Sequence, residues 1–261
     1  MKEISLQELR EIQLNILLEV HNFCEERNLR YSLGGGTLLG AVRHKGYIPW
    51  DDDIDIMMPR PDYERFIKEF VGYRPHLICG CFENDKNWVF PFTKLSDNRT
   101  LIEENGTIRE SGIDIDIFPI DGLPSSSKDL DKHILKIEFL KRAISYNKEP
   151  FRIHNSLLKK ALAFIAKMTN IVVMQERFLN LVKKYNFDNA NFAGAVTGLY
   201  GKKEVYKKSL FDSYSKLDFE GFYFSVVKDY DYYLTQHYGD YMQLPPIEKQ
   251  VTHHNYKAYV K

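Results

Sequence analysis

Apolar side chains near the start of the chain recur every three or four residues, which predicts an amphipathic helix. They are Leu6, Leu9, Ile12, Ile16, Val20 and Phe23. Ser5 stands just before this run, and Glu8 follows Ser5 by three residues. This spacing is a capping-box pattern, which marks the start of a helix. A short strand is expected at 29–33. It ends at three consecutive glycines, and a second helix is expected from Thr37 to His44.

Short β-type runs follow and predict strands. The first runs from Ile54 to Met58, ends at Pro59, and precedes a helix expected at about 62–70. Further strands are expected at 77–82, 90–95, 100–103 and 113–118. The first half of the chain therefore predicts a mixed α/β domain.

From about Ser127 to Tyr185 the apolar spacing becomes helical again, and the Gly- and Ser-rich stretch at 122–127 is the natural boundary. We therefore divide the chain into 1–124 and 125–261. Within the second part, the stretch 157–174 is interrupted by lysines and falls short of the ~18 uncharged residues of a membrane span. We interpret it as a buried or interfacial helix, and favour packing on the domain over contact with an anionic membrane.

Beyond this helical region, a hairpin is expected over 216–227 with its turn at Glu220-Gly221. An aromatic-rich helix is expected from Asp229 to Tyr238, before Gly239.

The chain has 261 residues, 44% of them hydrophobic, and a formal net charge of zero. This is enough apolar content for a buried core. Acidic and basic residues are equally numerous, so the chain as a whole has no net positive charge that would attract DNA or RNA. We therefore expect no nucleic-acid partner. Three cysteines are typical of buried thiols in a reducing compartment, and the first five residues lack the apolar stretch of a signal peptide. We expect a cytoplasmic protein.

The strongest chemical signal is the run Asp51-Asp52-Asp53-Ile54-Asp55, because four like charges within five residues cost free energy unless a cation or donors neutralise them. On a strand, Asp51, Asp53 and Asp55 would share one face. Converging carboxylates suit Mg²⁺ or Mn²⁺ bound together with a substrate phosphate. A calcium-binding EF-hand loop is excluded, since Ile56 stands where that loop needs glycine and Asp62 where it needs glutamate.

A second acidic pair, Asp114 and Asp116, alternates with isoleucines. The isoleucines would be buried and the two aspartates would share the opposite face. Alternation alone is also typical of a half-exposed edge strand with solvated aspartates, and it does not decide which aspartate is used.

The glycine run offers backbone N–H groups at a helix N-terminus, a surface suited to phosphate. We assign Gly35, Gly36 and Thr37 to donor binding, although three glycines alone are also a plain turn. Lys94 and Arg99 lie between the two acidic segments, where they would hold donor phosphates or be solvated charges at strand ends.

Aromatic and histidine residues are weaker candidates for substrate contacts. Tyr47, Trp50 and Trp88 offer ring faces to a quaternary ammonium, with core packing as the alternative. His253 and His254 offer acid–base or phosphate contacts, although adjacent histidines near a chain end are commonly just exposed.

Taken together, Gly35-Gly36, the Asp53-Ile54-Asp55 strand and a later strand aspartate resemble the nucleotidyltransferase superfamily. The fuller run from His44 to Ile56, with the segments 94–100 and 115–119, resembles the LicD family of phosphocholine transferases, relatives of the fukutin-related proteins. The resemblance is close over 31–122 and resumes at 233–246. It implies an α/β (α+β) fold, with a nucleotidyltransferase-like mixed-sheet catalytic core over 1–124. The remaining 125–261 would be a helical region and a C-terminal segment that completes the site.

The resemblance also implies that Asp53 and Asp55 bind the metal and that Asp116, the aspartate before Phe118-Pro119, is the third carboxylate, as ligand or general base. The implied reaction moves phosphocholine, or a related phosphoalcohol, from CDP-choline or another CDP-alcohol to a hydroxyl and releases CMP. The acceptor would be a glycan precursor of the teichoic acid or lipopolysaccharide type, lipid-linked where it lies at the inner face of the membrane. The alternatives are a nucleotide-sugar glycosyltransferase with an Asp-x-Asp metal site, and a non-catalytic glycan- or metal-binding module.

Overall fold

The computed structural model describes residues 1–104, 107–109, 111–148, 157–252 and 256–261. They fold into two units made of interleaved segments. Unit 1 comprises Met1–Cys79, Thr93–Phe118 and Ser209–Lys261, and unit 2 comprises Gly80–Phe92 and Pro119–Lys208. The predicted mixed α/β fold class is confirmed, while the division at residue 124 stays a prediction.

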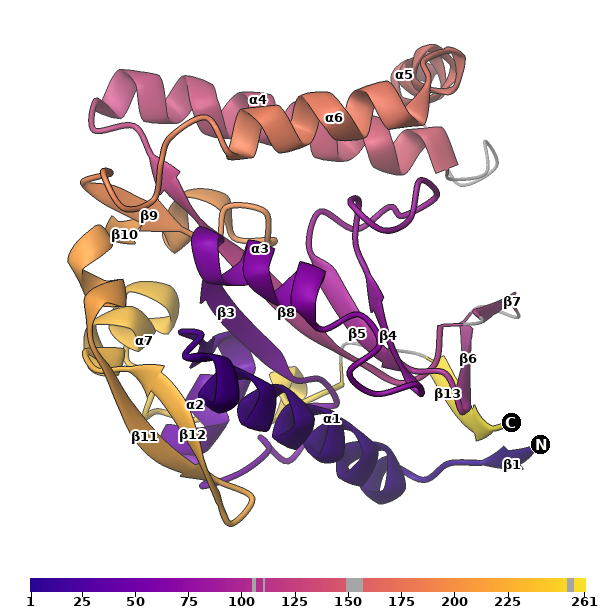
Figure 1. Cartoon of the computed structure of the whole chain (residues 1–261), viewed down its shortest axis with the longest axis vertical. Coiled ribbons are helices and arrows are strands. Elements are labelled where there is room, and N and C mark those ends of the chain that lie inside the picture. Colours follow the sequence, from indigo (N-terminus) through magenta and orange to yellow (C-terminus); the bar gives the residue numbers. More distant parts are fainter. Residues whose placement is uncertain (105–106, 110, 149–156, 253–255) are drawn as a thin grey trace. The chain divides into compact units, whose positions relative to one another are not determined.

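Unit 1 holds most of the strands (Figure 1). Its helices are α1 (Leu6–Arg27), α2 (Gly35–Arg43), α3 (Arg60–Glu69) and α7 (Tyr230–Tyr238), with short 3₁₀ turns η3 (Lys208–Asp212) and η4 (Ile247–Lys249). Its strands are β1 (Lys2–Glu3), β2 (Ser32–Leu33), β3 (Asp55–Pro59), β4 (Leu77–Gly80), β5 (Thr93–Asp97), β6 (Thr100–Glu104), β7 (Thr107–Arg109), β11 (Tyr214–Phe219), β12 (Phe222–Val227) and β13 (Tyr256–Val260). The strand β8 (Asp114–Leu123) begins in unit 1 and ends in unit 2.

The central sheet of unit 1 has the order β2-β3-β8-β5-β4. The strands β2 and β3 are antiparallel, as are β5 and β8. A smaller sheet, β1-β13-β6-β7, joins the two ends of the chain, and β11 and β12 form the predicted hairpin. These pairings place β3, which follows the first acidic run, beside β8, which carries the second.

Helices α1 and α3 supply much of the core of unit 1. The capping box predicted for α1 is confirmed, because the Ser5 hydroxyl accepts from the Glu8 N–H and the Glu8 carboxylate accepts from the Ser5 N–H. Phe23 of α1 meets Phe66 of α3 edge to face, with ring centroids 5.5 Å apart. This packing fixes α1, whose other residues reach the acidic run.

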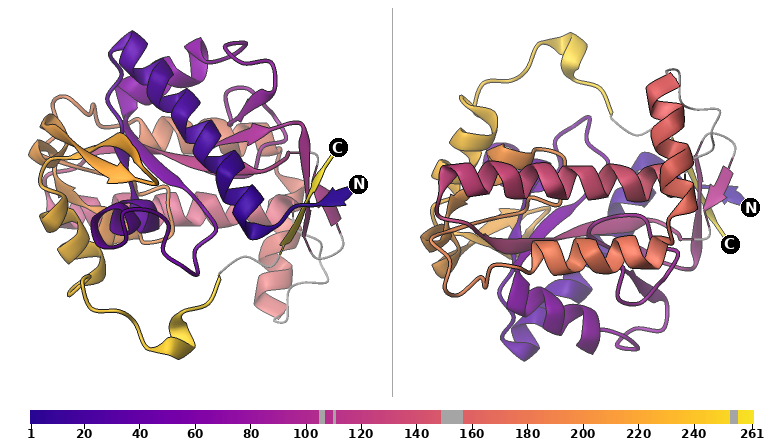
Figure 2. Two further views of the ribbon diagram at one scale, coloured as in Figure 1. Left: turned by 90° about the horizontal axis from the view of Figure 1, so that it is seen from below. Right: turned by 90° about the horizontal axis from the view of Figure 1, so that it is seen from above.

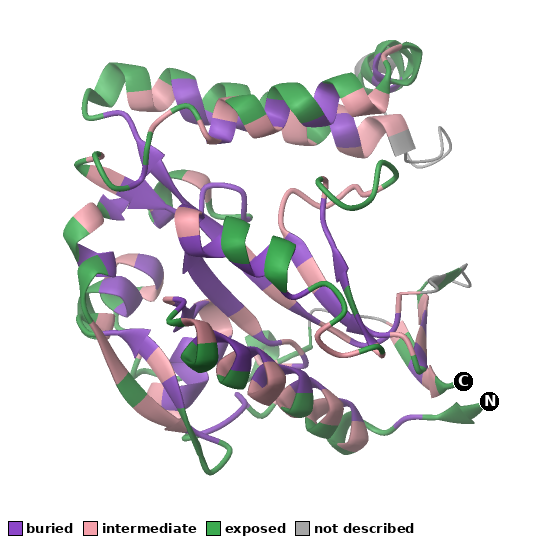
Figure 3. Cartoon of the chain, viewed as in Figure 1, coloured by how far each residue is buried: buried purple, intermediate pink, exposed green. Residues whose placement is uncertain are grey.

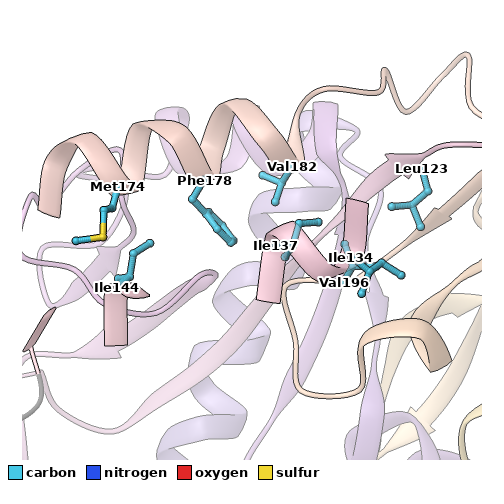
Figure 4. Close-up of a cluster of buried hydrophobic side chains, with 8 residues drawn as sticks. All are labelled: Leu123, Ile134, Ile137, Ile144, Met174, Phe178, Val182 and Val196. Carbon is cyan, nitrogen blue, oxygen red and sulfur yellow. The ribbon is translucent and has the colours of Figure 1, made fainter. Parts of the chain in front are cut away.

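Unit 2 contains the helices expected from the 3.6-residue spacing of apolar residues. It contains α4 (Ser127–Lys148), α5 (Leu157–Met168), α6 (Ile171–Val182), η2 (Gly201–Glu204), β9 (Phe192–Gly194) and β10 (Tyr206–Lys207). Figure 2 shows α4 and α6 side by side, with α5 across one end of the pair. Beneath them lies one apolar cluster (Figure 4). Its members are Leu123, Ile134, Ile137, Ile144, Met174, Phe178, Val182 and Val196.

The stretch 157–174, read from the sequence as one helix, is divided into α5 and the start of α6. The break lies at Thr169-Asn170, where the Asn170 side chain caps α6 by accepting from the Val172 N–H at 2.9 Å. Within the described ranges, none of the helices is both long enough and apolar enough to cross a bilayer.

Candidate active site

The acidic run is a loop that leads into β3, and it keeps the alternation predicted for a strand. Asp52 and Ile54 are buried, whereas Asp51, Asp53 and Asp55 are partly exposed. Although β3 begins only at Asp55, extended backbone before it has the same two-residue period. Three carboxylates therefore share one side of the chain.

Two polar residues of α1 hold this loop in place. The Arg10 guanidinium donates to the carbonyl oxygens of Pro49 (2.9 Å) and Asp51 (2.5 Å). The Gln13 side-chain amide donates to the Asp52 carbonyl at 2.9 Å and to the Asp114 carbonyl at 3.2 Å. One buried glutamine thus ties the first acidic run to the second.

The glycines let the acidic residues approach the first turn of α2. A Cβ atom on Gly35 would lie 2.7 Å from Asp55 Oδ2, and one on Gly36 would lie 2.6 Å from Asp51 Oδ2. Gly35 also has a φ of +48°, which favours glycine. The Thr37 hydroxyl accepts from the Asp55 N–H at 2.8 Å, which fixes the start of β3 against α2. The glycine run is therefore more than a plain turn, because the carboxylates occupy the space that side chains would need.

The second acidic pair joins the first through strand pairing. The Asp116 N–H donates to the Ile54 carbonyl at 2.8 Å, so β8 lies directly beside β3. On the other side of β8, Lys94 of β5 pairs with Asp116 in register. Its ammonium lies 2.5 Å from Asp116 Oδ1 and 3.0 Å from Asp114 Oδ1. Lys94 therefore bridges the two aspartates between which the sequence pattern could not decide.

These carboxylates are close enough to oppose one another's ionisation. Burial raises the pKa of Asp51 to about 8, and the charge of Asp53 adds to the shift. Burial also raises the pKa of Asp55 well above its ordinary value, helped by the charges of Asp53 and Asp116. The pKa of Asp116 is raised to about 6 by burial, against which the Lys94 ammonium acts. The site therefore gathers more carboxyl groups than Lys94 can pair with, and a bound cation would favour their ionised forms.

The donor set fits a hard divalent cation. Asp53, Asp55 and Asp116 offer carboxylate oxygens, the ligands that Mg²⁺ and Mn²⁺ prefer. Asp114 Oδ2 is buried and accepts no hydrogen bond, so the cluster contains an acceptor oxygen without a donor. In the described part of the chain, no group of three or more histidine, cysteine, aspartate or glutamate side chains is arranged to hold a metal ion by itself. Since Mg²⁺ commonly binds through one or two carboxylates plus substrate phosphate and water, the arrangement suits an ion bound together with a phosphate-bearing donor.

The two predicted phosphate-binding cations have different surroundings. Burial opposes the charge on Lys94, but the carboxylates of Asp116 and Asp114 outweigh it and raise the pKa of the ammonium. Arg99 instead forms a two-pronged ion pair with Asp97, at 2.6 Å and 2.9 Å, while 65% of its side chain stays exposed. Lys94 therefore lies in the acidic cluster. Arg99 instead pairs with Asp97, the last residue of β5.

The three aromatic residues predicted to contact substrate also have different surroundings. Tyr47 is buried with its hydroxyl donating to the Arg10 carbonyl at 3.1 Å and its ring against Phe219, so core packing describes it. Trp50 is only partly buried beside His44. Trp88 belongs to unit 2, where its indole N–H donates to the Phe92 carbonyl at 3.0 Å. The histidines at 253 and 254 lie outside the described residues.

Two tyrosines that the sequence did not single out reach this site from the C-terminal part of unit 1. The Tyr233 hydroxyl of α7 accepts from the Gly35 N–H at 3.2 Å. Burial, together with the charges of Asp52 and Asp114, raises the pKa of Tyr256 in β13. A tyrosine among seventeen carries no local signal, since only the fold brings these two to the acids.

Comparison with known proteins finds one matching family and several similar chains. The family model for the LicD/FKTN/FKRP nucleotidyltransferase domain matches residues 28–160, a range that contains both acidic segments. Lipopolysaccharide cholinephosphotransferase LicD of Haemophilus influenzae is 37% identical over 267 residues, covering 100% of both chains. An uncharacterised protein of Rickettsia typhi is 34% identical over 109 residues, 37% of this chain and 34% of its own length.

Proposed function

This chain belongs to the LicD family, and from that membership and its acidic site we propose that it is a metal-dependent phosphocholine transferase. The donor in this proposal is CDP-choline or a related CDP-alcohol. The acceptor is a hydroxyl of a cell-surface glycan precursor, of the lipopolysaccharide type in keeping with the name of the Haemophilus relative. CMP is the product released.

One observation carries the proposal. Carboxylates from two separate segments, Asp53 and Asp55 on one side and Asp116 on the other, converge beside the glycine-rich start of α2. Such an arrangement costs stability, because burial and mutual repulsion raise the pKa values of Asp55 and Asp116. A ligand that brings positive charge to the carboxylates and a phosphate to the N-terminus of α2 would offset this cost.

In the proposed step, the acceptor hydroxyl oxygen forms a bond to the β-phosphorus of the CDP-alcohol. The bond from that phosphorus to the oxygen shared with CMP breaks, and CMP leaves with the electron pair. Asp116 accepts the hydroxyl proton, a role suited by a pKa of about 6, close to the working pH. When bound to Asp53 and Asp55, Mg²⁺ or Mn²⁺ would neutralise charge on the phosphates.

The remaining residues position these groups. Lys94 holds the Asp116 carboxylate in one orientation through the 2.5 Å ion pair. Arg10 and Gln13 hold the backbone of the acidic loop, so that Asp53 and Asp55 keep their spacing. Since phosphoryl transfer depends mainly on positioning and electrostatics, these contacts bear directly on rate.

The experiment offers the purified chain CDP-choline, CDP-glycerol, CDP-ribitol and a set of nucleotide sugars, each with Mg²⁺ and a lipopolysaccharide-type acceptor. The released nucleotide is identified by chromatography. We expect CMP from CDP-choline, with transfer of phosphocholine to the acceptor and loss of turnover when Mg²⁺ is removed by a chelator. Asp53→Asn is the matched inactive control.

The rival functions give different products. Release of a nucleoside diphosphate from a sugar donor would identify a glycosyltransferase. Binding of donor or glycan without any turnover would identify a non-catalytic module. Either result would overturn the proposal.

A further inference from the structure

Among the side chains of helix α5 that the structure describes, those of residues 159–168, two alanines are buried and four large apolar side chains are exposed. The two buried alanines are Ala163 and Ala166. Four large apolar side chains are exposed instead: Leu162 (41%), Phe164 (57%), Ile165 (62%) and Met168 (77%). A helix that packs on its own domain normally turns its large apolar residues inward. The exposed face therefore needs an explanation outside the packing of unit 2.

The exposed residues form one continuous surface. Leu162 and Ile165 are three apart, as are Ile165 and Met168, and Phe164 and Met168 are four apart. Residues at these spacings are neighbours on a helix. Figure 3 shows α5 largely coloured as exposed, in contrast to the buried inner residues of α4 and α6.

The charges on α5 are all of one sign. Lys159, Lys160 and Lys167 are exposed, and the helix sequence from Leu157 to Met168 contains no acidic residue. Lys167 also donates to the Asn147 carbonyl of α4 at 3.0 Å. An apolar face flanked by lysines is typical of helices that lie in the interface of an anionic bilayer.

The length and the charge of α5 favour an anionic bilayer over other partners for its exposed apolar face. Twelve residues give a helix about 18 Å long, too short to span the ~30 Å core of a bilayer, so α5 would lie along the surface. A second copy of the chain would bring the same three lysines against these, and like charges would repel. A bilayer with anionic lipid offers both an apolar layer and negative phosphates.

We propose that α5 is a membrane-docking helix. Leu162, Phe164, Ile165 and Met168 enter the boundary between headgroups and acyl chains, while the lysines contact lipid phosphates. This inference goes beyond the proposed function, because it concerns binding alone and requires neither donor nor metal.

The test is co-sedimentation of the full chain with vesicles, without nucleotide or Mg²⁺. One set of vesicles is phosphatidylcholine alone, and the other contains phosphatidylglycerol as well. We expect binding to the anionic vesicles that weakens as salt is raised. The triple variant Lys159→Gln, Lys160→Gln, Lys167→Gln should bind about 100-fold more weakly, at about fivefold for each lysine.

A second variant removes the apolar contacts instead. Phe164→Ser with Ile165→Ser should weaken binding by about 100-fold or more, because two large side chains no longer leave water. Controls carry changes of the same kind, from apolar residues to serine and from lysine to glutamine, at exposed sites of unit 1: Val71→Ser with Ile247→Ser, and Lys68→Gln, Lys228→Gln, Lys249→Gln. These controls should bind as the unaltered chain does. Thermal melting of every variant checks that each is folded.

Equal binding by the α5 variants and the unaltered chain, or no preference for anionic vesicles, would overturn the proposal. So would a dimer in sedimentation velocity that the serine variant converts to a monomer while vesicle binding is unchanged, since a second copy would then be the occupant. Failure of phosphocholine transfer with vesicle binding intact would count against the proposed function alone.

Discussion

The acidic site of unit 1 and the apolar cluster of unit 2 both take residues from the strand β8, but the burial pattern of this strand differs between its two halves. In the first half of β8, partly exposed Asp114 and Asp116 alternate with buried isoleucines. In the second half, from Ile120 to Leu123, every residue is buried, and Leu123 joins the cluster beneath α4 and α6. The change of pattern coincides with the boundary between the units, at Phe118 and Pro119.

The difference separates function from stability. Buried apolar side chains such as Phe178 stabilise the fold by leaving water. Asp55 and Asp116 do the reverse, because burial raises their pKa values and their ionised forms cost free energy in the folded state. We therefore expect that substitutions in the two regions affect different measurements.

The largest effect is expected at Asp53 and Asp55. Asp53→Asn or Asp55→Asn should lower kcat/KM by about 1,000-fold or more, because several kcal/mol of charge stabilisation by the metal is lost. Thermal stability should be equal or higher, since like-charge repulsion is relieved. Steady-state kinetics and thermal melting measure the two quantities. Full activity in either variant would rule out the metal site.

Asp116 and Asp114 share Lys94, so the comparison between them is sharper. Asp116→Asn should lower kcat by about 100- to 10,000-fold, the range for loss of a general base, and Asp114→Asn should have a much smaller effect. Calorimetric titration of Mg²⁺ in each variant separates loss of the base from loss of a ligand. If Asp114→Asn were the more damaging, the roles of these two aspartates would be reversed.

In the apolar cluster, Phe178→Ala should lower stability and leave activity nearly unchanged, the reverse of the effect expected at the aspartates. Phe178 is fully buried between α4 and α6, so the cavity and the lost transfer free energy should reduce the free energy of unfolding by about 3–5 kcal/mol. Donor kcat/KM, measured well below the melting temperature, should change little. A loss below about 1 kcal/mol in chemical denaturation would contradict the assignment of this cluster as the core of unit 2.

We expect His133, in the same unit, to make the free energy of unfolding depend on pH. Its ring is buried against Tyr185 and its Nε2 makes no hydrogen bond. Burial lowers its pKa from 6.5 to about 4, with the charges of Lys184 and Lys136 adding to the shift. Between these pH values the unfolded chain binds the proton and the folded chain does not, so stability falls as pH falls from 6.5 to 4.

The loss from this one group should be about 1–3 kcal/mol. The difference in unfolding free energy between the unaltered chain and His133→Gln, measured by denaturation across this range, isolates it from other titrating groups. A difference that does not vary with pH would show that His133 takes no part.

Elements with local signals could be predicted from the sequence. The capping box at Ser5 and Glu8 gave the start of α1, and Glu220-Gly221 gave the hairpin turn, because each depends on neighbouring residues. Alternation placed Asp51, Asp53 and Asp55 on one side even though most of that run is loop. The break between α5 and α6 was missed, since the apolar period continues across the Asn170 cap.

The bridge from Lys94 to Asp116 was not predictable, because it depends on the register of two strands whose paired residues are 22 positions apart. The support from Arg10 and Gln13 was missed for a similar reason: they lie on a helix whose apolar face is the only pattern visible in sequence. Long-range pairing, unlike caps and turns, leaves no local composition signal.

The smallest expected effect concerns the choice of donor. Choline's trimethylammonium group donates no hydrogen bond, so its recognition depends on aromatic faces and carboxylates, and Tyr47 already packs in the core. Trp50 remains partly exposed next to the acidic run, so Trp50→Leu should remove one cation–π contact worth about 0.5–2 kcal/mol. The preference for CDP-choline over CDP-glycerol and CDP-ribitol, as a ratio of kcat/KM values, should narrow about two- to thirtyfold.

CMP should remain the product of the Trp50→Leu variant, because the reacting phosphates are not touched by this change. Phe139→Leu, which removes an exposed ring from α4, is the matched control and should leave the ratio unaltered. An unchanged ratio in Trp50→Leu would place choline recognition elsewhere. A preference of the unaltered chain for either polyol would refute the choline assignment while keeping the transfer chemistry, since in the proposed reaction the carboxylates act on the diphosphate and Trp50 contacts only the alcohol.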